Sequence, residues 1–235
     1  MSLNNRGWIF EKTARRILVS STLVILAAVL SEAVYFCTDK EFDEELRMGN
    51  IIPDVVDKIP DDILQVEYYN GVEPNIGHTL SPHVTYIPPV IVRWRLFDKK
   101  KNHTIILMDL DAPTTSSPTD RSYVHWMLTN VPGQKFLKGQ TVAKYEPILV
   151  PENDSGKHRL VFLCYIQKGN INVTEKYDDD KGPIKKARSK FSHQDFSKKY
   201  NFDRLMAINF FYSKYEANFT YTTIHPEALA NIRQP

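Results

Sequence analysis

Downstream of the apolar N-terminal segment, the run "HRLVFLCYIQ" (His158–Gln167) is the feature that most constrains the fold. It is the longest such run there, and polar residues do not alternate through it. A strand of this kind is buried on both faces, whereas a surface strand shows a two-residue alternation. We therefore predict that His158–Gln167 forms a central, buried strand of a sheet.

Several shorter runs with strand-like patterns accompany this central strand. Turn signals separate them, including Asn70–Gly71 and Pro132–Gly133. One segment, Phe191–Tyr200, carries aromatic residues at helical spacing and is predicted to be a helix. The spacing favours a mainly β fold, a β-sandwich or Greek-key sheet with short peripheral helices. The predicted strands are Ile63–Tyr69, Val90–Phe97, His103–Asp111, Val124–Val131 and Arg204–Tyr215.

Composition excludes several classes of protein. The chain has 235 residues, of which 42% are hydrophobic and 25% charged, so it is globular and not disordered throughout. A formal net charge of +2 gives no reason to expect a nucleic-acid partner. Nine glycines form no phosphate-binding loop, and the G-x-S-x-G and H-E-x-x-H motifs are absent from the sequence.

The N-terminal segment has the pattern of a secretory signal. Basic residues precede the uncharged run Ile17–Leu30, and the small-residue triplet Ser31–Ala33 follows it. We predict a signal peptide over residues 1–36, with an uncleaved membrane anchor as the alternative. A buried helix is disfavoured because the run lacks a polar face. The expected order is then a linker or short helix (37–50), a folded domain (51–225) and a tail (226–235).

Two further features bear on export. The sequence contains N-glycosylation motifs at Asn102, Asn153, Asn172 and Asn218, which together favour a secreted or extracellular glycoprotein. Cys164 lies inside the central apolar run and is expected to be a buried thiol. A disulfide bond between Cys164 and Cys37, the second cysteine, stays open as an alternative.

Polar residues stand at the ends of three predicted strands. They are Asp109, Asp111, His125 and His158. If these strands are neighbours, the side chains converge at one rim of the sheet. Acids beside histidines suit catalysis, a metal site or a small polar pocket that binds a zwitterion. Polar residues near strand ends are also common turn formers, so a purely structural role is the alternative.

Three motifs resemble those of the phosphatidylethanolamine-binding protein family. They are "DLDAP", "DRSYVHWMLTNVPG" and "SGKHRLVFLCYIQ", and the resemblance extends over Ile51–Phe219. It implies a large sheet packed on a smaller one, with a shallow pocket for phosphate or a phosphorylethanolamine head group. It also implies a modulator of kinases or proteases that is not an enzyme and needs no cofactor or metal.

The resemblance assigns candidate ligand-binding residues position by position. Asp109 and Asp111 match the acids of the first motif, and His125 and His158 match the histidines of the other two. Tyr123 takes the place of the family's tryptophan, and Pro151 falls near its proline-rich stretch. We expect His125 and His158 to bind the anionic part of a ligand, while Asp109 accepts from its ammonium or orients His125.

Departures from the family pattern predict an altered pocket. Leu110 replaces a proline, Val124 replaces a histidine and Leu160 replaces a tyrosine of the motifs. The loop "VPENDSG" is less rich in glycine and proline, and an Asn153 glycan would lie at the pocket mouth. Two alternatives follow, a vestigial pocket on a protein-interaction module and a metal-dependent hydrolase that uses the Asp/His cluster. The resemblance also implies cis peptide bonds at Ala112–Pro113 and Arg121–Ser122.

Overall fold

The computed structural model describes residues 38–95, 98–179 and 185–217. The chain divides into two units, Met1–Phe42 and Asp43–Pro235, and the strands described below all lie in the second. Among the described residues, no helix has both the length and the apolar composition needed to cross a membrane. Outside the described residues lie the predicted signal segment (1–36), the whole predicted tail (226–235), Cys37 and Asn218.

A large mixed sheet is the main element of the second unit. Its described part has seven strands in the order β1-β9-β8-β5-β6-β7, with β3 also paired to β9. β1 and β3 run parallel to β9, and the other neighbours are antiparallel. The strands are β1 (Asp62–Ile63), β3 (His78–Thr79), β5 (Asn102–Asp109), β6 (Tyr123–Pro132), β7 (Gln140–Ala143), β8 (Lys157–Gln167) and β9 (Phe202–Lys214).

The predicted strand Ile63–Tyr69 is divided between two sheets. Its first residue, Ile63, belongs to β1, and Gln65–Glu67 forms β2, which pairs with β4 (Ile91–Arg93) in a separate two-stranded sheet. Leu64 lies between them, fully buried, and its N–H donates to the carbonyl of Ile208 on β9. The chain therefore leaves the large sheet at Leu64 and enters the small one.

A hydrophobic core joins the small sheet to one face of the large sheet. Phe162 and Phe211 of the large sheet contact Tyr68, which follows β2, with ring centroids 6.5 and 6.1 Å apart. Burying a side chain of this size contributes about 1.5–3 kcal/mol, so these rings are major contributors to the core. Other members of the cluster include Val66, Val92, Trp94, Leu107, Trp126, Leu128, Leu160, Cys164 and Met206.

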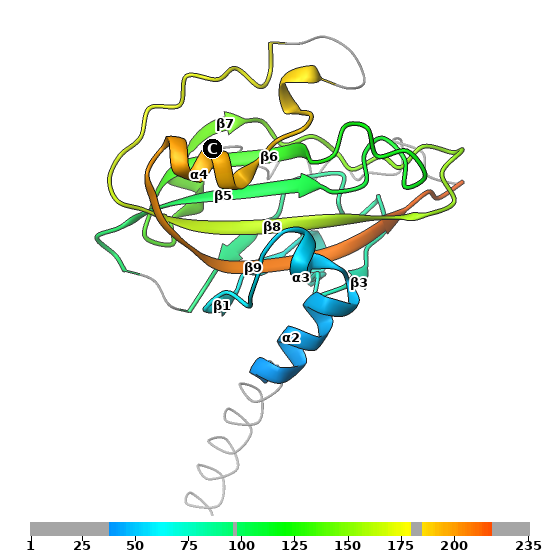
Figure 1. Ribbon diagram of the computed structural model, residues 1–235, viewed down its shortest axis with the longest axis horizontal. Helices are drawn as coiled ribbons and strands as arrows, with labels where there is room; N and C mark the ends of the chain where they lie inside the picture. Colours follow the sequence, from blue (N-terminus) through cyan, green and yellow to red (C-terminus); the bar gives the residue numbers. More distant parts are fainter. Residues whose placement is uncertain (1–37, 96–97, 180–184, 218–235) are drawn as a thin grey trace, which may run out of the picture. The chain divides into compact units, whose positions relative to one another are not determined.

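Short helices cover the opposite face, as Figure 1 shows for α3 (Ile51–Asp54) and α4 (His193–Lys199). Tyr165 of β8 points to this side, where its hydroxyl lies 2.6 Å from Nδ1 of His193. Because both faces are covered, β8 is buried from His158 to Gln167 apart from the half-buried Arg159. The other helical elements of the described residues are α2 (Asp39–Met48), η2 (Tyr69–Gly71), η3 (Phe136–Lys138) and η4 (Lys186–Arg188).

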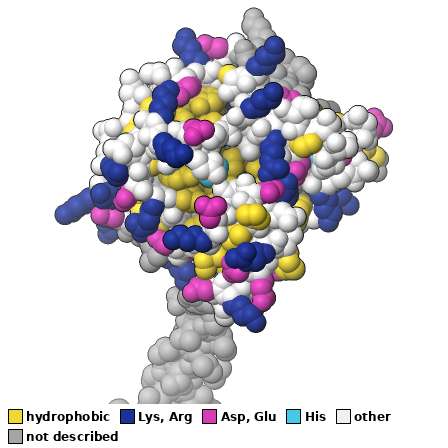
Figure 2. Space-filling model, viewed as in Figure 1, with side chains coloured by type: hydrophobic (Ala, Val, Ile, Leu, Met, Phe, Trp, Pro, Cys, Tyr) yellow, Lys and Arg dark blue, Asp and Glu magenta, His cyan; other side chains and the backbone are white. Residues whose placement is uncertain are grey.

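The predicted fold class is confirmed as mainly β, with a large sheet and short helices. The strand β8 is the predicted central one, α4 replaces the slightly longer helix predicted over 191–200, and α2 lies within the predicted linker. The short strands β3 and β7 were not predicted because neither carries an apolar run. Figure 2 shows acidic and basic side chains interspersed over this face of the molecule.

Candidate functional site

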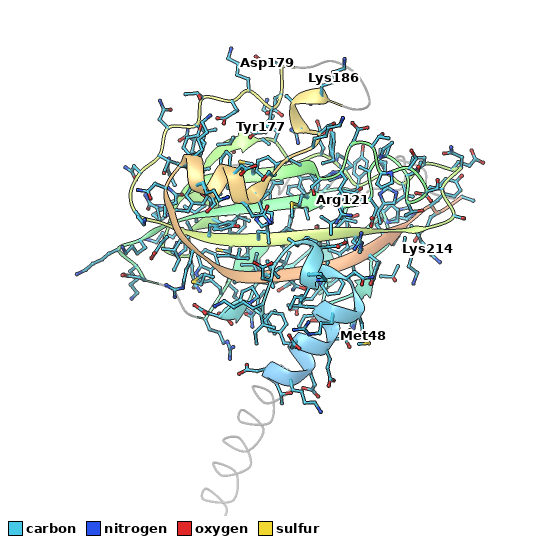
Figure 3. The ribbon with its side chains drawn as sticks, viewed as in Figure 1. Met48, Arg121, Tyr177, Asp179, Lys186 and Lys214 are labelled. Atoms are coloured by element: carbon cyan, nitrogen blue, oxygen red, sulfur yellow. The ribbon has the colours of Figure 1, made fainter. Side chains whose placement is uncertain are left out.

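Three of the four predicted polar residues, Asp109, His125 and His158, come together where β5 ends and β6 and β8 begin. Asp109, the last residue of β5, is in register with Tyr123 on β6 and Leu160 on β8. Lys214, the last residue of β9, pairs with Lys157 at the same end, and Figure 3 shows Arg121 on this side as well. Antiparallel pairing thus brings three segments, far apart in sequence, to one rim.

His158 lies between two carboxylates. Its Nδ1 is 2.6 Å from Oδ2 of Asp109, and its Nε2 is 2.9 Å from Oδ2 of Asp154. A carboxylate only accepts hydrogen bonds, so both ring nitrogens donate and the ring is an imidazolium. Burial opposes this charge, but the hydrogen bonds and charges of Asp109 and Asp154 outweigh burial and raise the pKa of His158.

Asp154 is a site residue that the sequence did not indicate. Burial opposes its charge, but hydrogen bonds from Thr115, Gly156 and His158 hold the pKa of Asp154 well below its usual range. Its own N–H donates to the carbonyl of Pro151, in a turn that places the side chain. The sequence signal for Asp154 is its position four residues before His158, in the loop "VPENDSG", whose composition predicted only a changed pocket rim.

His125 is buried and neutral. Its Nδ1 lies 3.1 Å from the carbonyl oxygen of Glu146, which can only accept, so Nδ1 carries the proton. Burial lowers the pKa of His125, and the charge of Asp109 offsets this only in part. Its Nε2 therefore presents a lone pair, 4.0 Å from Oδ2 of Asp109. We call Asp109, His125, Asp154 and His158 the acid–histidine cluster.

Two residues hold the strand that carries His125. The Tyr123 hydroxyl donates to Oε2 of Glu146 at 2.7 Å, and its ring lies edge-on to the His125 ring with centroids 5.2 Å apart. Arg188 is fully buried and donates to the carbonyls of Val124 and His125 at 2.8 and 3.2 Å. Tyr123 thus contacts the cluster through His125. Arg188 lies in a basic run, in which nothing in the sequence marks one member as buried.

Asp111 does not join the cluster. Arg159 donates to it through Nε, at 2.9 Å, and through Nη2, at 2.8 Å. Because side chains alternate along a strand, Arg159 faces the side of β8 opposite to His158. Arg159 and Arg121 each lie 3.0 Å from Oδ2 of Asp54. We call Asp54, Asp111, Arg121 and Arg159 the arginine network.

The residues that depart from the family pattern are apolar and buried. Leu110 is 1% exposed, and Val124 and Leu160 are fully buried. Leu160 belongs to the core cluster between the sheets, so it supplies packing and no hydrogen-bond donor. Both predicted cis peptide bonds, Ala112–Pro113 and Arg121–Ser122, are present, together with one that was not predicted, Ile52–Pro53.

Other predicted features fall elsewhere on the described residues. Asn153 and Asn172 are exposed, while Asn102 is half-buried and hydrogen-bonds Asn170. Cys164 is buried, and burial raises the pKa of its thiol.

In the part of the chain that is described, no group of three or more histidine, cysteine or acidic side chains is arranged to hold a metal ion. A surface groove of about 630 Å³ beside α4 is lined by Tyr177, Phe191, Phe196 and neighbouring residues, outside the cluster.

Comparison with known families identifies this arrangement. The family model described as phosphatidylethanolamine-binding protein matches residues 71–211, which include every residue of the acid–histidine cluster. The chain belongs to the phosphatidylethanolamine-binding protein family. The family resemblance of the sequence motifs is thereby confirmed.

Two relatives and one solved structure are each similar to a large part of this chain. A Drosophila melanogaster protein that carries the name odorant-binding protein A5 is 30% identical over 180 residues, 76% of this chain and 82% of its own. The 26 kDa secreted antigen of Toxocara canis is 32% identical over 124 residues, 53% of this chain and 46% of its own. Carboxypeptidase Y inhibitor, solved in complex with its cognate proteinase, shares the fold with a TM-score of 0.62 at 20% identity, over 75% of this chain and 96% of its own.

Proposed function

We propose that this family member is a non-enzymatic binding protein whose acid–histidine cluster takes a small zwitterion such as a phosphorylethanolamine head group. The observation that carries the proposal is the lone pair of His125 Nε2 beside the Asp109 carboxylate. Two carboxylates and one imidazolium leave the cluster with one net negative charge. The cluster therefore suits an ammonium group, which donates hydrogen bonds and is positively charged.

Calorimetric titration of the full-length chain with phosphorylethanolamine tests this proposal. We expect His125→Phe, which keeps an aromatic ring but removes both ring nitrogens, to weaken binding about tenfold or more. His78→Gln is the matched control, because His78 is exposed on β3 and lies outside the cluster. Equal affinities of wild type and His125→Phe would remove this histidine from the binding site.

A second candidate is a protein-interaction module, with a kinase or a protease as partner and a vestigial pocket. Its support is that Asp154 already occupies Nε2 of His158, the group that we expected to bind an anion. The carboxypeptidase Y inhibitor structure is an instance of this fold that is bound to a proteinase. Absence of any heat of binding with head groups at about 10 mM would favour this candidate over the first.

The hydrolase alternative requires a metal ligand that His158 does not offer. A metal binds the lone pair of an imidazole nitrogen, and both nitrogens of His158 donate to carboxylates. Elemental analysis of the purified chain tests this point. A stoichiometric transition metal would contradict the proposed non-enzymatic function.

Export completes the proposal. The signal-like segment, the exposed sequons at Asn153 and Asn172, and a relative named as a secreted antigen support a secreted glycoprotein. Mass spectrometry of material from the culture medium would report the mature N-terminus and the glycan on each asparagine. An intact N-terminus on cell-associated protein would support the anchored form instead.

A further inference from the structure

The Asp154 carboxylate is surrounded by hydrogen-bond donors from two segments of the chain. Its Oδ1 accepts from the Thr115 hydroxyl at 2.6 Å and from the Gly156 N–H at 2.9 Å. Its Oδ2 accepts from the Thr115 N–H at 2.6 Å and from Nε2 of His158 at 2.9 Å. One cation, two backbone amides and a hydroxyl therefore converge on a carboxylate that is 4% exposed.

This set of donors matches what a phosphate group requires. Phosphate oxygens are bound by charged donors and by backbone N–H groups that point to a common centre, and both are present here. A carboxylate of the protein uses the same donors, and two anions cannot share them. We call these donors, from Thr115, Gly156 and His158, the anion cradle.

The cradle is closely packed and does not depend on one flexible side chain. A Cβ atom at Gly156 would lie 2.1 Å from Oγ1 of Thr115 and 2.5 Å from its Cγ2, so only glycine fits between the two segments. The second nitrogen of His158 is fixed by Asp109 at 2.6 Å. Packing of Gly156 against Thr115 and the bond from His158 to Asp109 thus help to hold the donors in place beside Asp154.

We infer that Asp154 is an internal occupant of an anion site, and that its carboxylate holds the position a phosphate monoester would otherwise take. This inference rests on the proposed function, since both concern the acid–histidine cluster. The ammonium end of a zwitterion still reaches His125, but its phosphate must displace Asp154 to reach the cradle. The wild-type chain therefore binds free phosphate weakly, and removing the carboxylate exposes a phosphate site.

Three variants of the full-length chain separate occupancy of the cradle from charge. Asp154→Ala removes the occupant and keeps the Asn153 sequon, so glycosylation stays matched. Asp154→Asn removes the charge but leaves an amide oxygen in the cradle. Glu152→Gln removes one negative charge from an exposed position of the same loop.

Calorimetric titration with inorganic phosphate at neutral pH is the test. We expect Asp154→Ala to bind phosphate at least about tenfold more tightly than wild type. We expect Asp154→Asn and Glu152→Gln to gain less than about threefold, because the cradle stays occupied in both. An equal gain in Glu152→Gln would overturn the inference, since general electrostatic repulsion would then explain it.

Titration with phosphorylethanolamine and with ethanolamine distinguishes this inference from the proposed function. Phosphate binding by Asp154→Ala, with no binding of either amine by any variant, supports the cradle and contradicts the head-group site. Amine binding by wild type, without any phosphate gain in Asp154→Ala, supports the head-group site and overturns the cradle. Equal gains for free phosphate and for phosphorylethanolamine identify the phosphate group as the part that the cradle binds.

A measurement on the wild-type chain keeps the inference testable if Asp154→Ala fails to fold. Nuclear magnetic resonance follows the amide protons of Thr115 and Gly156 while phosphate is added. We expect both signals to stay in place up to about 10 mM phosphate, because Asp154 holds them. Saturable shifts of both amides below that concentration would show phosphate in the cradle beside Asp154, and would overturn the inference.

Discussion

Two ionic clusters start from neighbouring residues of β8 and differ in almost every physical respect. His158 belongs to the acid–histidine cluster, whose paired side chains are 3–5% exposed. Arg159 belongs to the arginine network, where Arg121 and Asp54 are each 35% exposed and Arg159 is 14% exposed. Strand alternation places the two clusters on opposite faces. The comparison shows that one strand end carries a buried ionic cluster on one face and a partly exposed one on the other.

The two clusters also differ in what pH does to them. Arginine stays protonated throughout the accessible range, so the cation of the arginine network is permanent. His158 holds its proton only because two carboxylates raise its pKa against the effect of burial. Around and above neutral pH, the buried cluster is therefore the one whose net charge changes with pH.

The largest expected effect is that of His158→Ala on stability. The substitution leaves Asp109 and Asp154 as buried carboxylates without their shared cation, and breaking a buried pair of this kind costs about 3–5 kcal/mol. The free energy of unfolding from urea denaturation measures the loss.

His193→Ala is the matched control for this loss. His193 is also a buried histidine, but its partners are the Tyr165 hydroxyl and the Val55 carbonyl, which are neutral. We expect it to cost about 1–3 kcal/mol, because no charge is left unpaired. Equal losses for the two substitutions would mean that the charges of the acid–histidine cluster add nothing to its stability.

A smaller effect is expected from removing only the proton of His158. Its pKa is raised in the folded chain above the usual 6.5, so its stabilising contribution is complete below about pH 6.5 and is lost as pH rises through the folded value. The free energy of unfolding should therefore fall on the alkaline side in wild type. In His158→Gln that alkaline decrease should be absent, and a decrease of the same size there would assign it to another group.

Buried neutral histidines change the free energy of unfolding in the opposite direction with pH, so they do not interfere with the measurement on His158. Burial lowers the pKa of His103, of His125 and, to about 4, of His193. Their contribution to stability is complete above the usual value of 6.5 and is lost as pH falls toward the folded values. They therefore decrease stability in acid, while His158 decreases it in alkali.

The sequence predicted those strands and site residues that local patterns determine. Continuous apolar runs identified β5, β6, β8 and β9, because strands buried on both faces need apolar residues at every position. Asp109, His125 and His158 were recognisable as acids and bases at the ends of those strands. Family resemblance added the two cis peptide bonds, which no periodicity indicates.

The parts that the sequence did not predict depend on tertiary direction. Asp109 and Asp111 are two residues apart and were expected on one rim, but the chain turns after β5 and Asp111 meets Arg159 on the other face. Asp154 lies in a loop, where sequence does not show which way a side chain points. Arg188 lies in a basic run, and a run of charges does not reveal that one member is buried.

The third effect on the free energy of unfolding is expected from Arg159, the central residue of the arginine network. Arg159→Ala removes two hydrogen bonds to Asp111, which is 8% exposed, and the ion pair with Asp54. We expect a loss of about 1–3 kcal/mol in the free energy of unfolding, below that of His158→Ala because water reaches part of this network. A loss equal to that of His158→Ala would remove the distinction between the two clusters.

The smallest effect is expected at the edge of the same network. Arg121 and Asp54 form an ion pair at 3.0 Å with both side chains 35% exposed, and exposed pairs contribute about 0–1 kcal/mol. Arg121→Ala should therefore change the free energy of unfolding by less than about 1 kcal/mol, and added salt should reduce the difference. Urea denaturation at low and high salt checks both points, with Arg159→Ala measured alongside. A salt-independent loss as large as that of Arg159→Ala would show that Arg121 is an internal member of the network, and the division between a buried and a surface cluster would then lie elsewhere in the molecule.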